Sequence, residues 1–401
     1  MRRRFFDPPI TDATFLQQRS WPEQSFNFGF FFFWCYGFVG VFPTYISLFF
    51  SEKGMTALQI GILMSLMQVM RIFGPAIWGW SADMMQKRSH VLRFTAMSAM
   101  TVFVGIFFGK TFFQFALIMI AINLFTSAQG SLGEAMMLSE MRGDLTYYGR
   151  LRLWGSVGYI ILVAISGFIL DWQGLELLPW ICLMVLAMIF ASSLRLRESA
   201  QPVSRSGNAS MRSLLLKKEV LAFFTSTCFM IAAHTALYIF FSLYLAHYGY
   251  SKWMIGMMWA IGTLAEVVFF FYQAPIFHRV GLRRLMLLSL LVAVVRFLMI
   301  GLGAESLLVL LIAQVLHGMT FGAHHAASVA TIQRWFAGSM QARGQALYTS
   351  ISYGLGGTLG GLCFSDLWGR FGPEAIYLVA AVLALMAFVA ALLSFRWQEK
   401  S

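Results

Sequence analysis

Twelve apolar stretches, most of them close to the length of a membrane-spanning helix, dominate the sequence and limit what it can fold into. They cover roughly residues 27–50, 57–81, 91–109, 113–138, 151–170, 177–194, 220–247, 252–274, 283–301, 305–327, 344–364 and 373–395. An α-helix needs about 20 apolar residues to cross a bilayer. Of all residues 11% are charged, against about 25% in a typical soluble chain. The sequence therefore predicts an all-α membrane protein with twelve transmembrane helices.

A polar, basic stretch at residues 195–219 divides the twelve apolar stretches six and six. It contains Ser, Gly and Pro, as expected of a flexible linker between two helical bundles. We therefore expect an N-terminal segment at 1–26, a first six-helix bundle at 27–194, a linker at 195–219, a second six-helix bundle at 220–395 and a tail at 396–401. We expect the protein to be a monomer.

Basic residues are distributed unevenly between the two sides of the predicted membrane. Of the 29 Lys and Arg residues, 23 fall on the side of the N-terminus, four fall on the opposite side, and Arg71 and Arg296 lie within spans. Because loops rich in Lys and Arg stay in the cytoplasm, we expect the N-terminal segment, the linker and the tail to be cytoplasmic, in a bacterial inner membrane. Topology explains the net charge of +12, so we expect a lipid bilayer around the chain and no nucleic acid as a partner.

The sequence lacks the motifs of a metal site or a hydrolase. The four cysteines all lie within apolar stretches and form no Cys-x-x-Cys pair, so we interpret them as packing residues. No His-Glu-x-x-His, Gly-x-Ser-x-Gly or phosphate-binding loop occurs. These observations argue against an intramembrane enzyme, and we expect neither a metal nor another cofactor.

Two charged residues flank the turn between the fourth and fifth spans. Glu134 closes one apolar stretch, Arg152 opens the next, and a charged turn separates them. Neighbouring helices joined by such a turn run antiparallel, which brings Glu134 and Arg152 to a similar depth. A charge inside a membrane usually has a partner or faces a polar cavity. The pattern therefore predicts either a helix-end ion pair or a site that binds a polar solute.

The two halves of the chain repeat each other. The segment after the second span, residues 79–88, and the segment after the eighth, residues 274–284, are both basic and occupy the same place in a six-span half. Two charged residues within spans hold equivalent positions: Arg71 lies 12 residues before Asp83 in the first segment, and Glu266 lies 12 residues before His278 in the second. Such a duplication is typical of secondary transporters built from two parallel halves.

The first of these segments also resembles a known signature. Gly79-x-x-x-Asp83 followed by Lys87 and Arg88 resembles the loop between spans two and three of the major facilitator superfamily. With twelve spans divided six and six, the resemblance extends over the whole chain. It implies the major facilitator fold, transport by alternating access, and a gating loop that contains Gly79, Asp83, Lys87 and Arg88.

Residues 148–159, which read Tyr-Gly-Arg-Leu-Arg-Leu-Trp-Gly-Ser-Val-Gly-Tyr, are similar to the start of span five in the lactose-permease and phenylpropionate-permease branch. In the lactose permease, a Glu in span four and an Arg in span five bind the sugar. Glu134 and Arg152 match these residues in type and in spacing, and Tyr159 stands where that permease has a Trp that stacks on the sugar ring. The resemblance thus implies a substrate-binding role for Glu134, Arg152 and Tyr159.

Spans eight to ten carry the residues that the resemblance links to proton coupling. Glu266 and Arg296 match an essential Glu and an essential Arg of the lactose permease, and His317 matches its His in span ten. Thr320 stands where that permease has the proton-carrying Glu. The segment that follows, residues 321–328, looks more like the phenylpropionate-permease group, which we take as the nearest relatives.

Span ten contains three histidines that are candidates for moving a proton or contacting a solute. An unperturbed histidine titrates at about pH 6.5. His324 and His325 are adjacent and cannot share a helix face, whereas His317 and His324 are seven residues apart and can face the same way. We expect His317 to act in coupling or substrate binding, and His324 to act in coupling. His234 in span seven either joins them or is a satisfied histidine of the bundle.

Two charged residues inside spans complete the set of candidates. A carboxylate that alternates between water and a drier cavity can take up a proton on one side and release it on the other. We hypothesise that Glu266 does so; the alternative is a clamp between helices, made by Glu266 with Arg296 or His317. Arg71 either binds the carboxylate of an organic acid, which a guanidinium matches with two hydrogen bonds, or pairs with Glu266.

These observations predict a proton-coupled secondary active transporter, a symporter that imports a small organic solute by alternating access. A phenylpropionate-like carboxylic acid is the first choice of substrate. A proton-coupled sugar or nucleoside permease and an efflux permease of the same fold are the alternatives, and an intramembrane enzyme is the rival from another class. The expected partners are the solute, protons and the bilayer.

Overall fold

The computed structural model describes residues 24–140, 145–197, 212–336 and 340–399, and within these residues every regular element is helical. The helices form twelve segments in two halves of six over this part of the chain, so the predicted all-α fold with twelve transmembrane helices is confirmed. The predicted N-terminal segment (1–26), linker (195–219) and tail (396–401) lie partly outside the described residues.

In the described part of the chain, six segments make up the first half. They are α1 (Ser25–Glu52), α2 (Ala57–Met85), α3 (Arg88–Phe103) extended by the 3-10 turn η2 (Val104–Phe107), α4 (Phe112–Glu140), α5 (Leu145–Gln173), and α6 (Leu178–Ser193) preceded by the 3-10 turn η3 (Leu175–Leu177). Phe28, Phe31 and Phe32 of α1 are fully buried. Because α1 packs against α5 on one side and α6 on another, it forms the core of this half.

The second half has six segments in the same part of the chain, two of them interrupted by π-helical turns. They are α8 (Lys218–His247), α9 (Lys252–Val280), α10 (Leu282–Leu302), span ten made of α11 (Leu307–Val315), η4 (Gly318–Ala323) and α12 (His324–Trp335), span eleven made of α13 (Gln341–Tyr348), η6 (Thr349–Gly356) and α14 (Gly357–Phe371), and α15 (Pro373–Gln398). The short helix α7 (Arg212–Leu215) precedes α8.

Span eleven differs from the others in composition. Among the described residues, eleven helices are long and apolar enough to cross a membrane, and the segment from α13 to α14 is not one of them. It is rich in glycine, and its glycines permit close packing. A Cβ at Gly360 would lie 2.7 Å from the carbonyl oxygen of Ala232 in α8. Glycine at this position therefore lets α14 approach the backbone of α8.

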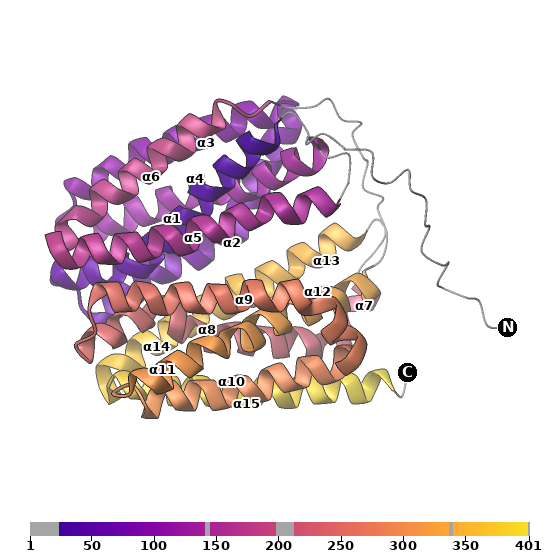
Figure 1. Ribbon diagram of the computed structural model, residues 1–401. Helices are drawn as coiled ribbons and strands as arrows, with labels where there is room; N and C mark the ends of the chain where they lie inside the picture. The colour runs from indigo at the N-terminus through magenta and orange to yellow at the C-terminus, as the bar shows by residue number, and fades with distance from the viewer. Residues whose placement is uncertain (1–23, 141–144, 198–211, 337–339, 400–401) are drawn as a thin grey trace, which may run out of the picture.

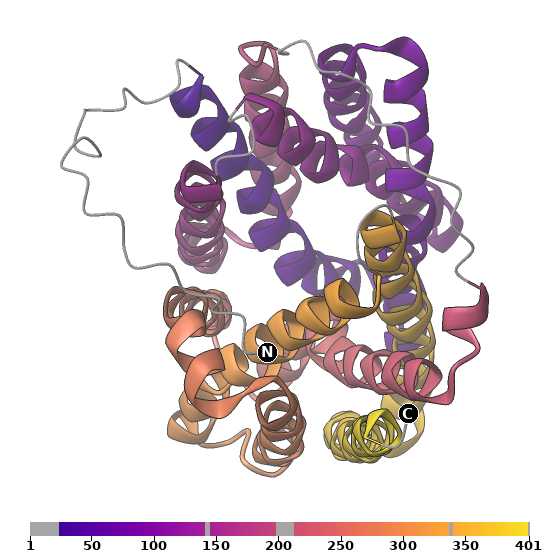
Figure 2. The same ribbon diagram turned by 90° about the vertical axis from the view of Figure 1, so that its right-hand side faces the viewer.

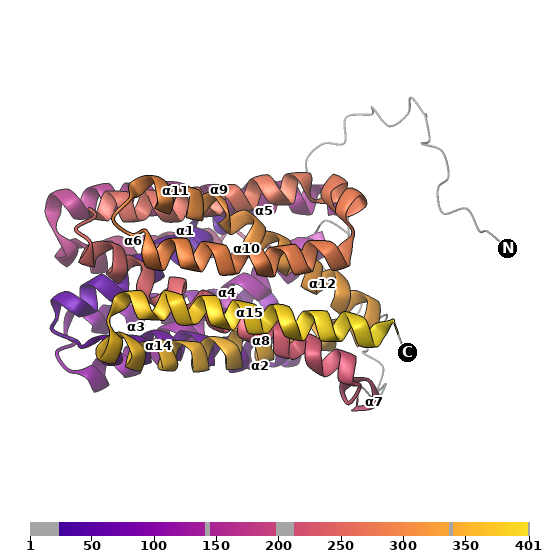
Figure 3. The same ribbon diagram turned by 90° about the horizontal axis from the view of Figure 1, so that it is seen from below.

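The two halves lie side by side, with their helices running along one common direction (Figure 1). Viewed along that direction, the helices of the two halves form separate groups (Figure 2). The halves meet through α5 against α9 and through α2 against α14. α10 and α15 cover the face of the second half that is turned away from the first (Figure 3). Helices α2 and α5 of the first half and α9 and α14 of the second therefore lie along the boundary between the halves.

The positions of three features, namely the end of α15, the helix α7 and the contact between Gln24 and Arg197, define one end of the molecule. The end of α15 and the short helix α7 lie at one end (Figure 1), and the Gln24 side chain, just before α1, bonds the backbone of Arg197, just after α6. We call this the terminal end. The opposite end, where α1 ends and α9 begins, is called the far end.

The segment predicted to be a gating loop is mostly helical. α2 continues through Gly79 and Asp83, and the chain turns only at Gln86, which has a left-handed backbone (φ 52°). Lys87 precedes α3, and Arg88 is its first residue. The prediction that all four residues lie in a loop is therefore wrong, because the helix continues from Gly79 to Met85. The Gln86 side chain donates to the carbonyl of Asp83 at 2.7 Å and so caps the end of α2.

Candidate functional site

A cavity of about 320 Å³ lies between the two halves. Its walls come from α1, α2 and α5 of the first half and from α8, α9, span ten and span eleven of the second. Five predicted site residues line it, namely Arg71, Arg152, Tyr159, Glu266 and His317. The fold thus gathers residues that are up to 246 positions apart in the chain (71 and 317) into one site.

Glu134 and Arg152 pair with each other across α4 and α5. The Arg152 Nε lies 3.2 Å from the Glu134 Oε1, and each side chain is 33% exposed. The Tyr36 hydroxyl donates to the same Oε1 at 3.1 Å, and the Arg152 guanidinium lies 3.7 Å from the centroid of the Tyr36 ring. The expected similar depth of the two charges is confirmed. The ion pair uses only the Nε of Arg152, so its Nη donors have no partner among the described residues.

Tyr159 lines the cavity from α5, and Thr44 of α1 and Thr263 of α9 line the same cavity. A role in stacking on a solute remains a prediction, and the position of the ring is compatible with it.

Glu266 and His317 form the second charged pair, between α9 and span ten. The His317 Nε2 lies 2.7 Å from the Glu266 Oε1, and the two side chains are 7% and 20% exposed. Of the two clamps considered from the sequence, the one with His317 is the one present. At this distance one proton is shared in a hydrogen bond, either carried by the imidazole or by the carboxyl group. The other ring nitrogen of His317, Nδ1, is buried and has no partner among the described residues.

Arg296 is buried in the second half and is bonded to neutral groups of span ten. Its side chain donates to the Ala313 carbonyl at 2.6 Å, to the Gln314 Oε1 at 3.3 Å and to the Thr320 hydroxyl at 3.3 Å. It is 1% exposed and does not line the cavity. Thr320 therefore helps to hold the guanidinium. Arg296 forms no ion pair with Glu266.

The π-helical turn η4 changes which residues of span ten share a face. The rings of His317, Phe321 and His325 stack in one column, with centroids 5.5 and 6.0 Å apart and interplanar angles of 11° and 10°. A π-helix closes hydrogen bonds between residues five apart, not four, and so rotates the residues that follow it. The seven-residue spacing of His317 and His324 assumed a regular α-helix. The structure places His325, not His324, in line with His317.

The two adjacent histidines consequently have different surroundings. His324 is 1% exposed, does not line the cavity, and its Nε2 has no partner among the described residues. The His325 Nδ1 lies 3.3 Å from the Tyr348 hydroxyl and 3.2 Å from the Tyr353 hydroxyl. Tyr353 lines the cavity. His325 is thus connected to the cavity through Tyr353, and the role in coupling expected of His324 stays a prediction without a contact to support it.

His234 of α8 joins the histidines of span ten. Its ring centroid lies 6.0 Å from that of His317, and the residue is fully buried. The His234 Nδ1 lies 3.0 Å from the Met230 carbonyl oxygen. A carbonyl can only accept, so Nδ1 carries a proton and donates it.

Arg71 lines the cavity from α2 and is exposed. Across the described residues it forms no ion pair and no hydrogen bond, and in particular it does not pair with Glu266. A guanidinium is well suited to bind a carboxylate through two parallel hydrogen bonds. Of the two roles considered from the sequence, binding of an anion is the one that the geometry leaves open.

Sequence reasoning missed the aromatic residues that the second half contributes to the cavity wall. Tyr238, Trp259, Phe321 and Tyr353 line the cavity together with Tyr36 of α1. Aromatic residues make up 16% of the chain, and no pattern in the sequence distinguished those four from the others. Their positions depend on how the two halves pack.

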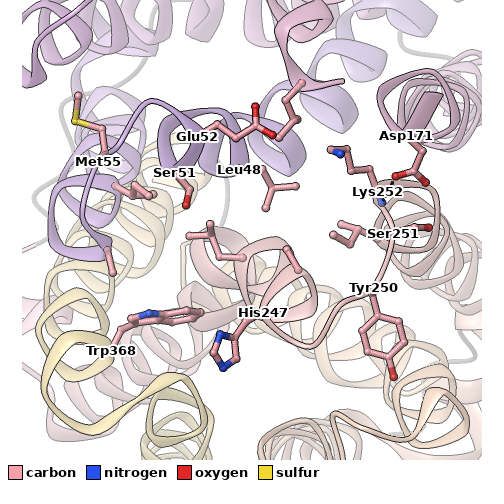
Figure 4. A pocket seen from close by; sticks show the side chains of 16 residues that line it. Leu48, Ser51, Glu52, Met55, Asp171, His247, Tyr250, Ser251, Lys252 and Trp368 are labelled. Atoms are coloured by element: carbon pink, nitrogen blue, oxygen red, sulfur yellow. Dashed lines mark hydrogen bonds between the residues drawn. The ribbon is translucent and has the colours of Figure 1, made fainter. Parts of the chain in front are cut away.

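At the far end, a second cavity of about 470 Å³ lies between the halves (Figure 4). Here the Asp171 carboxylate accepts hydrogen bonds from the backbone N–H groups of Lys252 and Trp253, at 2.7 and 2.8 Å. The first N–H groups of a helix have no partner within the helix and attract a carboxylate. Asp171, at the end of α5, thereby fastens the first half to the start of α9.

Comparison with known proteins connects this architecture to a family. The sequence model of the MFS_1 like family matches residues 26–379. The chain is 28% identical over 355 residues to the "Probable 3-phenylpropionic acid transporter" of Escherichia coli (strain K12), which covers 87% of this chain and 92% of that protein. It is 23% identical over 368 residues to the "Maltose permease" of Geobacillus stearothermophilus, covering 91% and 92% of the two chains.

A solved structure has the same fold. The crystal structure of the nucleoside transporter NupG superposes on this chain with a TM-score of 0.80 at 16% sequence identity, covering 93% of this chain and 99% of that one. At this level of identity the similarity concerns the fold and the arrangement of the two halves.

Proposed function

The chain belongs to the MFS_1 like family and is a multi-pass membrane transporter, and from that premise we propose that it is a proton-coupled symporter that imports a phenylpropionate-like carboxylic acid. In this proposal it lies in the inner membrane with the terminal end in the cytoplasm and the far end outside. One observation carries the proposal: Arg71, which has no acidic partner among the described residues, lines the same cavity as the Glu266–His317 pair.

The charges of the cavity favour an anionic solute. Arg71 and Arg152 are its cationic residues, and its one carboxylate among the described lining residues, Glu266, is already bonded to His317. A solute carboxylate on Arg71 would gain two charge-assisted hydrogen bonds. The aromatic side chains of the wall offer edge and face contacts for a phenyl ring. The similarity to a protein named as a 3-phenylpropionic acid transporter supports the same substrate class.

The proposed coupling follows from the balance of two charges. In the empty carrier, the positive charge of Arg71 offsets the negative charge of Glu266. With a carboxylate on Arg71 and a proton on Glu266, each of the two sites is neutral, and the net charge of the cavity is again zero. Binding of the anion alone or the proton alone leaves one uncompensated charge in the cavity. Since an unbalanced charge is costly in a closed, water-poor site, the carrier closes only when it is empty or when it holds both.

Alternating access requires that the two ends open in turn. Asp171 joins the halves at the far end, whereas Arg71 is exposed and each side chain of the Glu134–Arg152 pair is 33% exposed. In the proposed cycle this arrangement is the state open toward the cytoplasm, in which Glu266 releases its proton and Arg71 releases the solute. Breaking the contacts of Asp171 would open the outer side.

Uptake of labelled 3-phenylpropionate into liposomes that contain the purified protein tests this proposal. We expect accumulation that grows with an inward proton gradient and is abolished by an uncoupler. Liposomes without protein measure the acid that crosses the lipid in its neutral form. Arg71→Gln is expected to weaken the affinity for the transported acid about 10-fold or more, because it removes the two charge-assisted hydrogen bonds to the carboxylate. Arg279→Gln, which replaces an exposed arginine of α9 outside the cavity, is the matched control.

The same liposomes distinguish the sugar and nucleoside alternatives. The Glu134–Arg152 pair with Tyr36 beneath it is an arrangement that can also bind hydroxyl groups, and one relative is named as a maltose permease. Gradient-driven uptake of maltose or uridine without uptake of 3-phenylpropionate would contradict the carboxylic acid proposal. Uptake of the acid that is indifferent to the proton gradient would contradict the coupling.

A further inference from the structure

A side pocket of about 310 Å³ extends from the central cavity into the first half, between α1, α2 and α4. The two spaces share five lining residues, namely Tyr36, Val39, Pro43, Met67 and Arg71. Arg71 therefore lies where the two spaces meet. A solute held by its carboxylate on Arg71 can extend into this pocket as well as into the space between the halves.

The walls of the side pocket are of two kinds. α1 and α2 supply an apolar wall that includes Phe38, Phe42 and Pro75. α4 supplies a polar strip made of Asn123, Thr126, Ser127 and Gln129, with Gly130 beside it. Positions 123, 126, 127 and 130 follow the i, i+3, i+4, i+7 spacing of a helix and lie on one face of α4. Among the described residues that line the pocket, Arg71 is the one with a charge.

The hydrogen bonds of the polar strip leave one side chain unsatisfied. The hydroxyls of Thr126 and Ser127 donate to carbonyls of their own helix at 2.8 and 2.7 Å, and the Asn123 amide donates to the Met119 carbonyl at 2.7 Å. Gln129 is 3% exposed, and its Nε2 has no partner among the described residues. A buried amide without a partner is costly and calls for an explanation. A polar group of a bound molecule would supply the missing partner.

The pocket also has room at its α4 wall. A Cβ added at Gly130 would meet no atom within 4 Å. A cavity of about 150 Å³ lined by apolar side chains is large enough to bind benzene, so a pocket of about 310 Å³ holds a phenyl ring with a short chain. The space is thus apolar on one wall, polar on the other, and cationic at its mouth.

Resting on the proposed transport of a carboxylic acid, we propose that this side pocket is the subsite for the aryl end of the solute. The carboxylate binds Arg71, the ring packs against Phe38 and Phe42, and a hydrogen-bonding substituent on the ring meets the amide of Gln129. The preferred substrates are accordingly arylpropionates with a polar ring substituent, such as a phenolic hydroxyl group. The residues that line this subsite all belong to the first half.

Calorimetric titration of the purified protein with 3-phenylpropionate and with 3-(4-hydroxyphenyl)propionate tests the subsite without requiring transport. Gly130→Met places a side chain in the pocket and is expected to weaken binding of both acids about 10-fold or more, because it takes the space of the ring. Gly369→Met is the matched control: Gly369 lies in α14, outside both spaces, and a Cβ there also meets no atom within 4 Å. Thermal unfolding of both variants verifies that they remain folded.

The two acids and a second variant make the outcome specific. We expect the wild type to prefer the hydroxylated acid by roughly 5-fold, and Gln129→Leu to remove this preference while both acids still bind, as the loss of one hydrogen bond predicts. Equal affinity of Gly130→Met and the wild type for the acids would overturn the subsite, as would failure of the wild type to bind either acid. Binding that is sensitive to Gly130→Met but is not followed by gradient-driven uptake would support the subsite and contradict the proposed symport.

Discussion

The two halves of the molecule hold their charged pairs in different ways. In the first half, Glu134 and Arg152 lie 3.2 Å apart with each side chain 33% exposed. In the second, Glu266 and His317 lie 2.7 Å apart with side chains 20% and 7% exposed. Electrostatic interactions are stronger where water is excluded and weaker where it enters. The first pair can therefore exchange its partners for a solute at low cost, whereas the second responds strongly to the gain or loss of one proton.

The contacts around each pair support the same difference between the two halves. Arg152 rests on the Tyr36 ring and uses one donor in its ion pair, so it retains donors for a solute. In the second half, Arg296 is fixed by three bonds to span ten and is not free to neutralise Glu266. A duplicated fold has thus placed binding chemistry in one half and proton chemistry in the other, in our account. Three substitutions test this division.

The largest effect is expected from the buried pair. His317→Gln removes the imidazole that shares a proton with Glu266, and proton-transfer groups typically contribute about 100-fold or more to a rate. We therefore expect the initial rate of gradient-driven uptake of 3-phenylpropionate to fall by at least about 100-fold. His90→Gln, which replaces an exposed histidine of α3, should transport normally. A His317→Gln variant with normal gradient-driven uptake would show that the buried pair has no part in coupling.

A smaller and different effect is expected from the exposed pair. Glu134→Gln removes the partner of Arg152 and lets the guanidinium move from its place above Tyr36. We expect the affinity for the solute to weaken about 5- to 10-fold, because a half-exposed ion pair contributes on the order of 1 kcal/mol. The number of protons moved per solute should not change. Glu176→Gln, at an exposed carboxylate of η3, is the control, and loss of the proton stoichiometry in Glu134→Gln would break the division between the halves.

The smallest effect is expected at Tyr36. Tyr36→Phe keeps the ring beneath Arg152 but removes the hydroxyl that donates to Glu134 at 3.1 Å. A partly exposed hydrogen bond falls at the lower end of the usual range, about 0.5–1 kcal/mol, so affinity should weaken roughly 2- to 5-fold. Tyr272→Phe, at an exposed tyrosine of α9, is the control and should leave the affinity for the solute unchanged. A loss of more than about 10-fold would mean that the hydroxyl contacts the solute directly and does not merely orient Arg152.

Much of this architecture was predictable from the order of residues. The twelve spans follow from local hydropathy, and the approach of Glu134 and Arg152 follows from two helices joined by one turn. Both inferences use only neighbours in the sequence. The Glu266–His317 contact joins α9 to span ten, two helices with α10 between them in the chain. Sequence alone therefore left Arg296 and His317 as equal candidates.

Local departures from regular helix geometry account for the other differences. The π-helical turn η4 brings His325 into line with His317, where a regular helix would have favoured His324. The resemblance to the loop between spans two and three of the major facilitator superfamily predicts a loop at Gly79, yet the backbone remains helical as far as Met85. Asp171 drew no attention in the sequence, since its partners are backbone N–H groups of the other half. Such contacts have no signature in side-chain patterns.

Glu266→Gln separates exchange from net transport, and this measurement tests the central claim most directly. A glutamine is neutral at every pH, so the solute-loaded carrier with its carboxylate on Arg71 stays balanced, while the empty carrier keeps the charge of Arg71 uncompensated. In liposomes, the variant should exchange labelled for unlabelled 3-phenylpropionate at a rate near that of the wild type. It should show neither net accumulation nor alkalinisation of the outer medium on addition of the acid. Alkalinisation by Glu266→Gln at the wild-type level would contradict the account, because the proton would then have another carrier.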